Sequence, residues 1–95
     1  NMKEGILIPD MQSGRADIRF NSDDCYGGLH CGTTMDILLD GQWVPTRIEM
    51  GRQGWFLVGV QLETNGGIGY AFHGNQTVMP SKTRCRPIIV ATILL

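Results

Sequence analysis

Apolar and polar residues alternate along the central part of the chain, as they do in strands that bury one face. The alternation is clearest between residues 33 and 60, where turn residues separate three apolar runs. We place the first turn at Gly41-Gln42, because a glycine in the first position suits a type II′ hairpin. This turn pairs Leu39 with Val44 and predicts the first hairpin of an antiparallel meander.

The second turn of the meander, Gly51 to Gly54, pairs Met50 with Trp55 and Ile48 with Leu57. Both hairpins then share one strongly apolar face, which we expect to be the core side. The opposite face carries Leu38, Trp43, Phe56 and Val58 beside Arg47 and Glu49. Such a face is too apolar to be left in water, so we expect another strand, a partner or a ligand to cover it.

The remaining segments also read as short strands separated by turns. They are residues 5–8, 16–20, 68–72, 76–79 and 88–95. The last run is apolar almost throughout, as is typical of a strand buried on both faces. We therefore predict an all-β fold, a small SH3-like or partly open β-barrel built on the central antiparallel meander.

The length of 95 residues predicts one domain. We assign it to residues 2–95, with residue 1 interpreted as the remnant of an expression tag and residues 61–95 as its C-terminal part. The net charge of −1 gives no general attraction to nucleic acid or to an anionic membrane. The apolar run Ile88 to Leu95 is also far shorter than the roughly 20 residues of a membrane helix.

Three cysteines cannot all be paired in a monomer. Together with an N-terminal segment whose apolar run is too short for a signal peptide, this predicts a cytoplasmic protein with reduced thiols.

Three blocks of sequence carry a resemblance to a known family: Tyr26 to Gly32, Asp40 to Glu49 with its Trp-Val-Pro-Thr-Arg-Ile-Glu ending, and Trp55 to Gly59. Over about residues 25–60 the chain resembles a family of short uncharacterised domains from mobile elements and plasmids of Gram-positive bacteria. The resemblance implies a setting of conjugation or plasmid maintenance and transfers no catalytic residue. The Val-Arg-Ile ending usual in the family is missing after Gly59, so residues 61–95 are divergent.

Two kinds of chemistry compete with a simple binding role. Cys25 or Cys31 could act as the nucleophile of a cysteine-peptidase-like enzyme with His73, but such a cysteine needs a helix N-terminus, and here glycines and a strand follow. Cys25, His30 and Cys31 with Cys85 or His73 are ligand types that zinc takes, at a spacing unlike that of a zinc knuckle. We therefore expect no catalytic residue, no metal and no cofactor, and keep the thiol-dependent enzyme as the alternative.

The favoured hypothesis is a non-enzymatic binding module of a mobile element. Small barrels bind partners through aromatic residues set among basic ones on one face. The candidate binding residues are Tyr26, His30, Trp43, Arg47, Arg52 and Phe56. The charge balance favours a protein partner over nucleic acid, and a homodimer through the uncovered face is a further alternative. Trp43 and Phe56 could instead close a second small core under the C-terminal strand.

Overall fold

The computed structural model describes residues 1–10, 12–52, 54–60, 71–73, 76–78 and 88–95, with segments 71–73 and 76–78 described by their backbone alone. These residues contain strands and no helix. The strands are β1 (Met2–Pro9), β2 (Ala16–Asn21), β3 (Asp24–Cys25), β4 (Thr34–Leu39), β5 (Gln42–Gly51), β6 (Gly54–Leu57), β7 (Ala71–His73), β8 (Gln76–Val78) and β9 (Ile89–Leu94).

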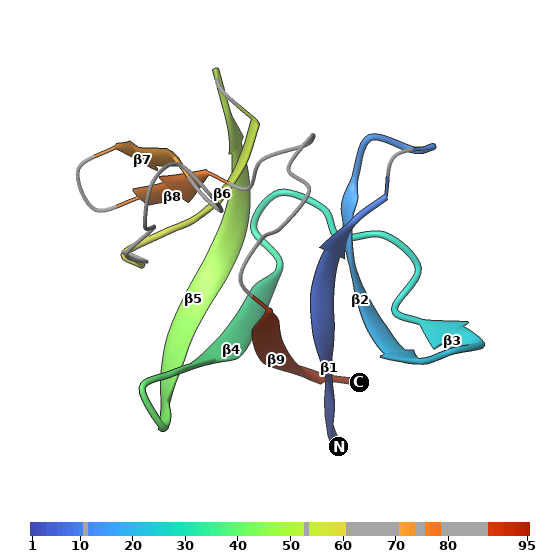
Figure 1. The fold of residues 1–95 in the computed structure, drawn as a ribbon. Helices are drawn as coiled ribbons and strands as arrows, with labels where there is room; N and C mark the ends of the chain where they lie inside the picture. The colour runs from blue at the N-terminus through green and yellow to red at the C-terminus, as the bar shows by residue number, and fades with distance from the viewer. Residues whose placement is uncertain (11, 53, 61–70, 74–75, 79–87) are drawn as a thin grey trace.

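Within the described part of the chain, all strands join one antiparallel sheet in the order β3-β2-β1-β9-β4-β5-β6-β8-β7. The sheet curls, so that β1 and β2 stand opposite β5 and β6 with β9 and β4 between them (Figure 1). The Trp55 indole N–H from β6 donates to the carbonyl oxygen of Gly14, in the β1–β2 turn, over 2.8 Å. Because β9, β4 and β5 separate β6 from β1 in the sheet, this bond spans the open side of the curl. The predicted all-β, partly open barrel on an antiparallel meander is confirmed.

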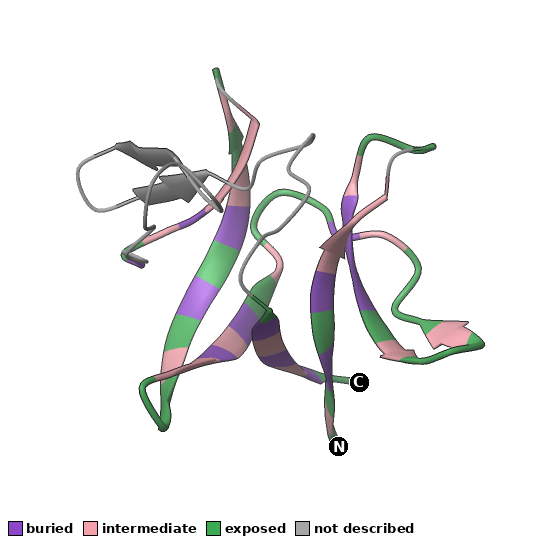
Figure 2. Ribbon diagram, in the orientation of Figure 1, coloured by how far each residue is buried: buried purple, intermediate pink, exposed green. Residues whose placement is uncertain are grey.

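The concave face of this sheet holds the core. Burial alternates along the strands, which is clearest on the long strand β5 (Figure 2). The buried apolar residues come from β1, β2, β4, β5, β6 and β9 and from two loops: Leu7, Ala16, Ile18, Leu29, Met35, Ile37, Ile48, Leu57, Val60, Ile89, Ala91 and Ile93. Distant segments thus share one core, as is typical of a curled sheet.

A strap of residues 26–33 connects the edge of the sheet to its centre and closes one end of the core. Its Tyr26 N–H donates to the Ile18 carbonyl on β2, and its Gly32 N–H donates to the Ile48 carbonyl on β5, each over 2.8 Å. Leu29, midway along the strap, is fully buried. The strap therefore covers one end of the core with Leu29, and hydrogen bonds fix its backbone at both ends.

The first hairpin turns one residue earlier than the sequence predicts. Its turn residues are Asp40 and Gly41, with φ of 49° and 78°, and Leu39 pairs with Gln42. Two successive positive φ angles define a type I′ turn, for which Asp-Gly is a favoured sequence. The predicted pairing of Leu39 with Val44 is therefore wrong. Moving the turn by one residue changes the cross-strand partner of every residue by two positions. Because residues two apart along a strand share a face, the apolar faces remain as predicted.

The second hairpin agrees with the prediction, since Met50 pairs with Trp55 and Ile48 with Leu57. Pro45 lies in the half of β5 that pairs with β4 alone, as expected of a residue that has no N–H to donate.

The position of the C-terminal strand in the sequence was predicted correctly, but the prediction that both of its faces are buried is wrong. β9 lies between β1 and β4 inside the sheet, so it covers no second core, and Trp43 and Phe56 do not pack beneath it. Ile89, Ala91 and Ile93 are buried on the concave face, whereas the alternate residues of β9 are half-buried or exposed. The apolar sequence of β9 therefore reflects burial on one face only.

Candidate functional site

The convex face of the sheet collects three of the predicted binding residues. Trp43 and Arg47 lie on the same side of β5, because residues two and four apart along a strand share a face. Phe56 of β6 is the cross-strand partner of Glu49, and so it joins the same face. Trp43 is 43% exposed, which is high for the largest side chain of the set.

A row of apolar side chains extends from Trp43 across the sheet, and the sequence pattern had placed only Leu38 and Trp43 of this row on a common face. Leu38 pairs with Trp43, and Val90 pairs with Ile6. The β4–β9 register, continued by one residue, brings Leu38 beside Val90. We call Ile6, Val90, Leu38 and Trp43 the convex row. Val90 and Leu38 are half-buried, and the two ends of the row are exposed.

A second apolar pair lies on the same face near the chain ends. Met2 pairs with Leu94, and their exposed fractions are 54% and 69%. Ile88, just before β9, is 74% exposed. A sheet face with this many exposed aliphatic and aromatic residues is typical of an interaction surface.

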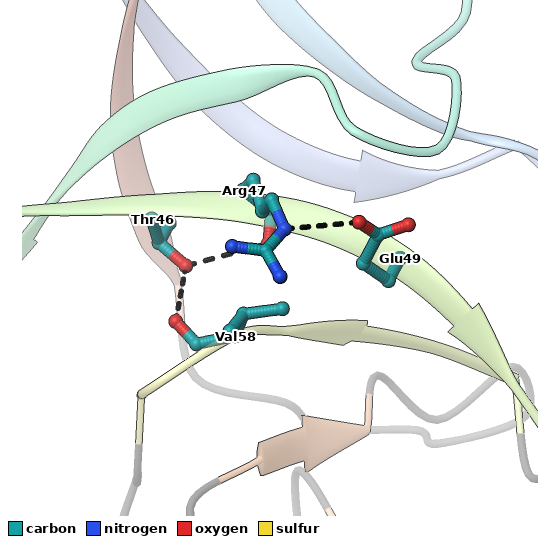
Figure 3. A network of polar contacts seen from close by, with 4 residues as sticks. All are labelled: Thr46, Arg47, Glu49 and Val58. Atoms are coloured by element: carbon teal, nitrogen blue, oxygen red, sulfur yellow. Dashed lines mark hydrogen bonds and ion pairs between the residues drawn. The ribbon is translucent and has the colours of Figure 1, made fainter.

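The charge of Arg47 is already compensated. Its Nε–H donates to a carboxylate oxygen of Glu49 over 3.0 Å, on the exposed side of β5 (Figure 3). The neighbouring hydroxyl of Thr46 is buried and donates to the Val58 carbonyl over 2.7 Å, while the Val58 N–H donates to the Arg47 carbonyl. These two hydrogen bonds hold β5 and the segment after β6 together, so the backbone of Arg47 is fixed in position.

Arg52, Tyr26 and His30 lie elsewhere. Arg52 is exposed in the β5–β6 hairpin, at the opposite end of β5 from Trp43. Tyr26 and His30 are exposed on the strap, with the Tyr26 backbone attached to β2. In the sheet, β1, β9 and β4 separate β2 from β5. The structure thus brings Trp43, Arg47 and Phe56 together and leaves the other three predicted residues in separate places.

The Asp17 side chain fixes the conformation of the strap, and the sequence analysis did not identify this residue. One oxygen of this buried carboxylate accepts hydrogen bonds from the backbone N–H groups of Ile18, Gly27 and Gly28, at 2.9 to 3.0 Å. Gly27 and Gly28 both have strongly positive φ, of 110° and 103°, which side-chain-bearing residues rarely adopt. The Gly-Gly pair after Tyr26 is therefore explained by the turn that it forms around Asp17.

The two cysteines in the described part of the chain, Cys25 and Cys31, are free thiols on the surface. Neither lies at a helix N-terminus, because the described residues form no helix. Cys85 and the side chain of His73 lie outside the described residues, as does any contact they would make. Among the residues that are described, no three His, Cys, Asp or Glu side chains are grouped as metal ligands would be.

Nothing in the described ranges is a helix long and apolar enough to cross a membrane.

Comparison with known proteins places the chain in a family. Residues 5–73 match the family described as "Domain of unknown function (DUF5348)". The chain belongs to this family. The match confirms the predicted membership of an uncharacterised family and reaches further than the predicted residues 25–60 in both directions.

The chain is also similar to a protein of known structure. A crystal structure of a protein from Ruminococcus gnavus, a Northeast Structural Genomics Consortium target, is 42% identical in sequence, with a TM-score of 0.61. The similarity covers 81% of this chain and 100% of that protein. No protein of curated function matches the chain. These comparisons establish the family and support the fold.

Proposed function

We propose that this domain is a non-enzymatic binding module that docks a protein partner on its convex face. The observation that carries the proposal is the convex row, in which four apolar side chains from four adjacent strands lie together and Trp43 remains 43% exposed. Exposed aromatic residues surrounded by aliphatic ones are enriched at the centres of protein interfaces.

The electrostatics of the convex face favour protein over nucleic acid. A phosphate backbone is bound mainly by uncompensated Lys and Arg side chains. Arg47, the basic residue closest to Trp43 along β5, is paired with Glu49. The same face carries the carboxylates of Glu4 and Asp36, since Glu4 and Asp36 both pair with Thr92 of β9. Arg19 of β2 is exposed beside Ile6 on this face, but the two carboxylates outnumber it, which disfavours the binding of phosphate groups.

In a wider setting, the domain would serve as an accessory protein of a mobile element that blocks or modulates a host protein. The resemblance to domains of plasmids and mobile elements supports this setting. A cytoplasmic location with reduced cysteines fits the same setting.

Site-specific photo-crosslinking tests the docking face. Trp43→p-benzoylphenylalanine places the crosslinker on the convex row, and Met50→p-benzoylphenylalanine is a matched control on the same strand. Met50 is 49% exposed, nearly the same as Trp43, but points to the other face. In a Gram-positive host we expect a discrete protein adduct from position 43 and none from position 50.

Three results would contradict the proposal. A nucleic-acid adduct at position 43 would replace the protein partner with DNA or RNA, and its affinity should then fall steeply as salt rises. Equal labelling at positions 43 and 50, or no adduct at either, would show that the convex row is not a binding surface. Mass spectrometry of the adducts separates these outcomes.

The thiol-dependent enzyme remains the second candidate, resting on the exposed Cys25 and Cys31. A catalytic thiolate would be alkylated near neutral pH far faster than a free cysteine in a peptide. Alkylation at the peptide rate would leave the two cysteines as ordinary surface thiols.

A further inference from the structure

The convex face carries a charge pattern that narrows the class of partner. Glu4 and Asp36 each pair with Thr92, so the two carboxylates flank β9 on neighbouring strands. Strands lie about 4.8 Å apart, which places the backbones of Glu4 and Asp36 about 10 Å from each other. Pro45 pairs with Asp36 and completes this acidic row.

The acidic row lies between the convex row and the apolar pair Met2 and Leu94. The convex row lies two residues away along the strands in one direction. Two residues away in the other direction lie Met2 and Leu94 on β1 and β9, followed by the polar pair Thr34 and Arg47 on β4 and β5. A partner that covers both apolar groups must therefore also cover the carboxylates between them.

The backbones of Glu4 and Asp36 belong to the sheet, but their carboxylates form no hydrogen bond or ion pair with any residue in the described ranges. Among the nearby described cations, Lys3 pairs with Asp24 and Arg47 with Glu49, whereas Arg19 of β2 is exposed beside Ile6 on the convex face and forms no ion pair with either carboxylate. Covering an unpaired carboxylate with an apolar surface is costly, because the charge loses its water without gaining a partner.

Two symmetric pairings with a second copy of this chain, both centred on the acidic row, are disfavoured by charge. Two sheets packed face to face about a two-fold axis along β9 would set Glu4 of one copy against Asp36 of the other. A two-fold axis across the strands at the acidic row would set each carboxylate against its own equivalent. Both arrangements oppose like charges, which disfavours association.

From this pattern we infer that the convex face recognises a protein segment in which Lys or Arg side chains stand between apolar ones, the basic groups meeting Glu4 and Asp36. The inference rests on the proposed function and names the chemistry of its partner. The apolar residues of the segment would cover the convex row and the Met2–Leu94 pair. The charge would select the partner, as complementary charges do at other interfaces.

A displayed random-peptide library selected on the immobilised domain is the direct probe. The wild-type domain should enrich peptides with Lys or Arg flanked by apolar residues, and these should be lost on Trp43→Ala. Glu4→Lys and Asp36→Lys should each weaken an enriched basic peptide by about fivefold, the effect of one partly exposed ion pair. The two variants together should enrich acidic peptides instead.

Asp23→Lys is the matched control, because it makes the same change in net charge in the exposed β2–β3 turn. It should bind the basic peptide as the wild type does. Unfolding curves of all variants verify that each one folds.

The outcomes separate the inference from the proposed function. Peptides that depend on Trp43 but show no basic preference, or that bind Glu4→Lys and Asp36→Lys unchanged, would overturn the inference and leave the docking face intact. No Trp43-dependent peptide at all would overturn both. A doubled mass in solution that Trp43→Ala abolishes would identify a second copy as the occupant and would also overturn the inference.

Discussion

The concave and convex faces of the curled sheet are built from the same strands and have different roles. On the concave face, Ile37, Ile48 and Leu57 are fully buried, and their burial is the main source of stability. On the convex face, Trp43 and Ile6 remain exposed. The fold does not need the convex side chains to be apolar, so their composition calls for another explanation, and the partner binding proposed above is one.

Neighbouring residues on β4 give the sharpest test of this difference. Ile37 faces the core with no exposed surface, and Leu38 is half-buried on the convex face. We expect Ile37→Ala to lower the free energy of unfolding by about 3 kcal/mol, through lost burial and a residual cavity. Leu38→Ala should lower it by about 1 kcal/mol. Urea unfolding measures both, and equal losses would show that the convex face is also part of the core.

Gly5 tests how tightly the concave face is packed. A Cβ on Gly5 would lie 2.5 Å from the Arg19 carbonyl oxygen and 2.7 Å from the Ile18 Cγ2, so β1 and β2 would have to separate. We expect Gly5→Ala to lower the free energy of unfolding by about 2 kcal/mol. Gly51→Ala is the control, since its Cβ would meet the Phe56 ring at 3.1 Å, and a ring can shift. A smaller loss for Gly5→Ala than for Gly51→Ala would contradict this packing.

Asp17 tests whether the strap belongs to the core. Asp17→Ala leaves the N–H groups of Gly27 and Gly28 without their acceptor, so the strap that carries Leu29 should loosen. We expect a loss of about 2 kcal/mol in unfolding free energy, with faster hydrogen exchange at residues 26–29. Asp23→Ala, in an exposed turn, should change neither quantity by a comparable amount. Unchanged exchange in the strap of Asp17→Ala would refute the anchoring role.

The β1–β2 turn belongs to neither face and should show the smallest effect. The Ser13 hydroxyl and the Gln12 N–H donate to the Asp10 carboxylate and hold its pKa below the ordinary value of 3.8. A carboxyl whose pKa is lowered by folding stabilises the fold above its unfolded pKa, and this contribution disappears as the pH falls below about 4 through the folded pKa. NMR titration should show the low pKa in the wild type and a return towards 3.8 in Ser13→Ala. An unchanged pKa in Ser13→Ala would assign the shift to another group.

The sequence predicted the parts of the fold that depend on neighbouring residues. The apolar alternation around Ile48 identified the core side of β5, and the turn from Gly51 to Gly54 set the pairing of the second hairpin. The first turn was misplaced because Gly41 was assigned to the first turn position, although the sequence Asp40-Gly41 favours the type I′ turn that the two positive φ angles define. Trp43, Arg47 and Phe56 were predicted to share a face because they lie within one meander.

The local pattern of hydrophobicity thus determined by itself that this chain forms strands, which side of each strand is buried, and that a surface near Trp43 is unusually apolar. Only the tertiary structure decided that β9 inserts between β1 and β4, which aligns Ile6 and Val90 with Leu38 and Trp43 and puts Glu4 and Asp36 on either side of Thr92. Strand order depends on contacts between segments more than fifty residues apart. The period-two pattern within each segment carries no information about its neighbours in the sheet.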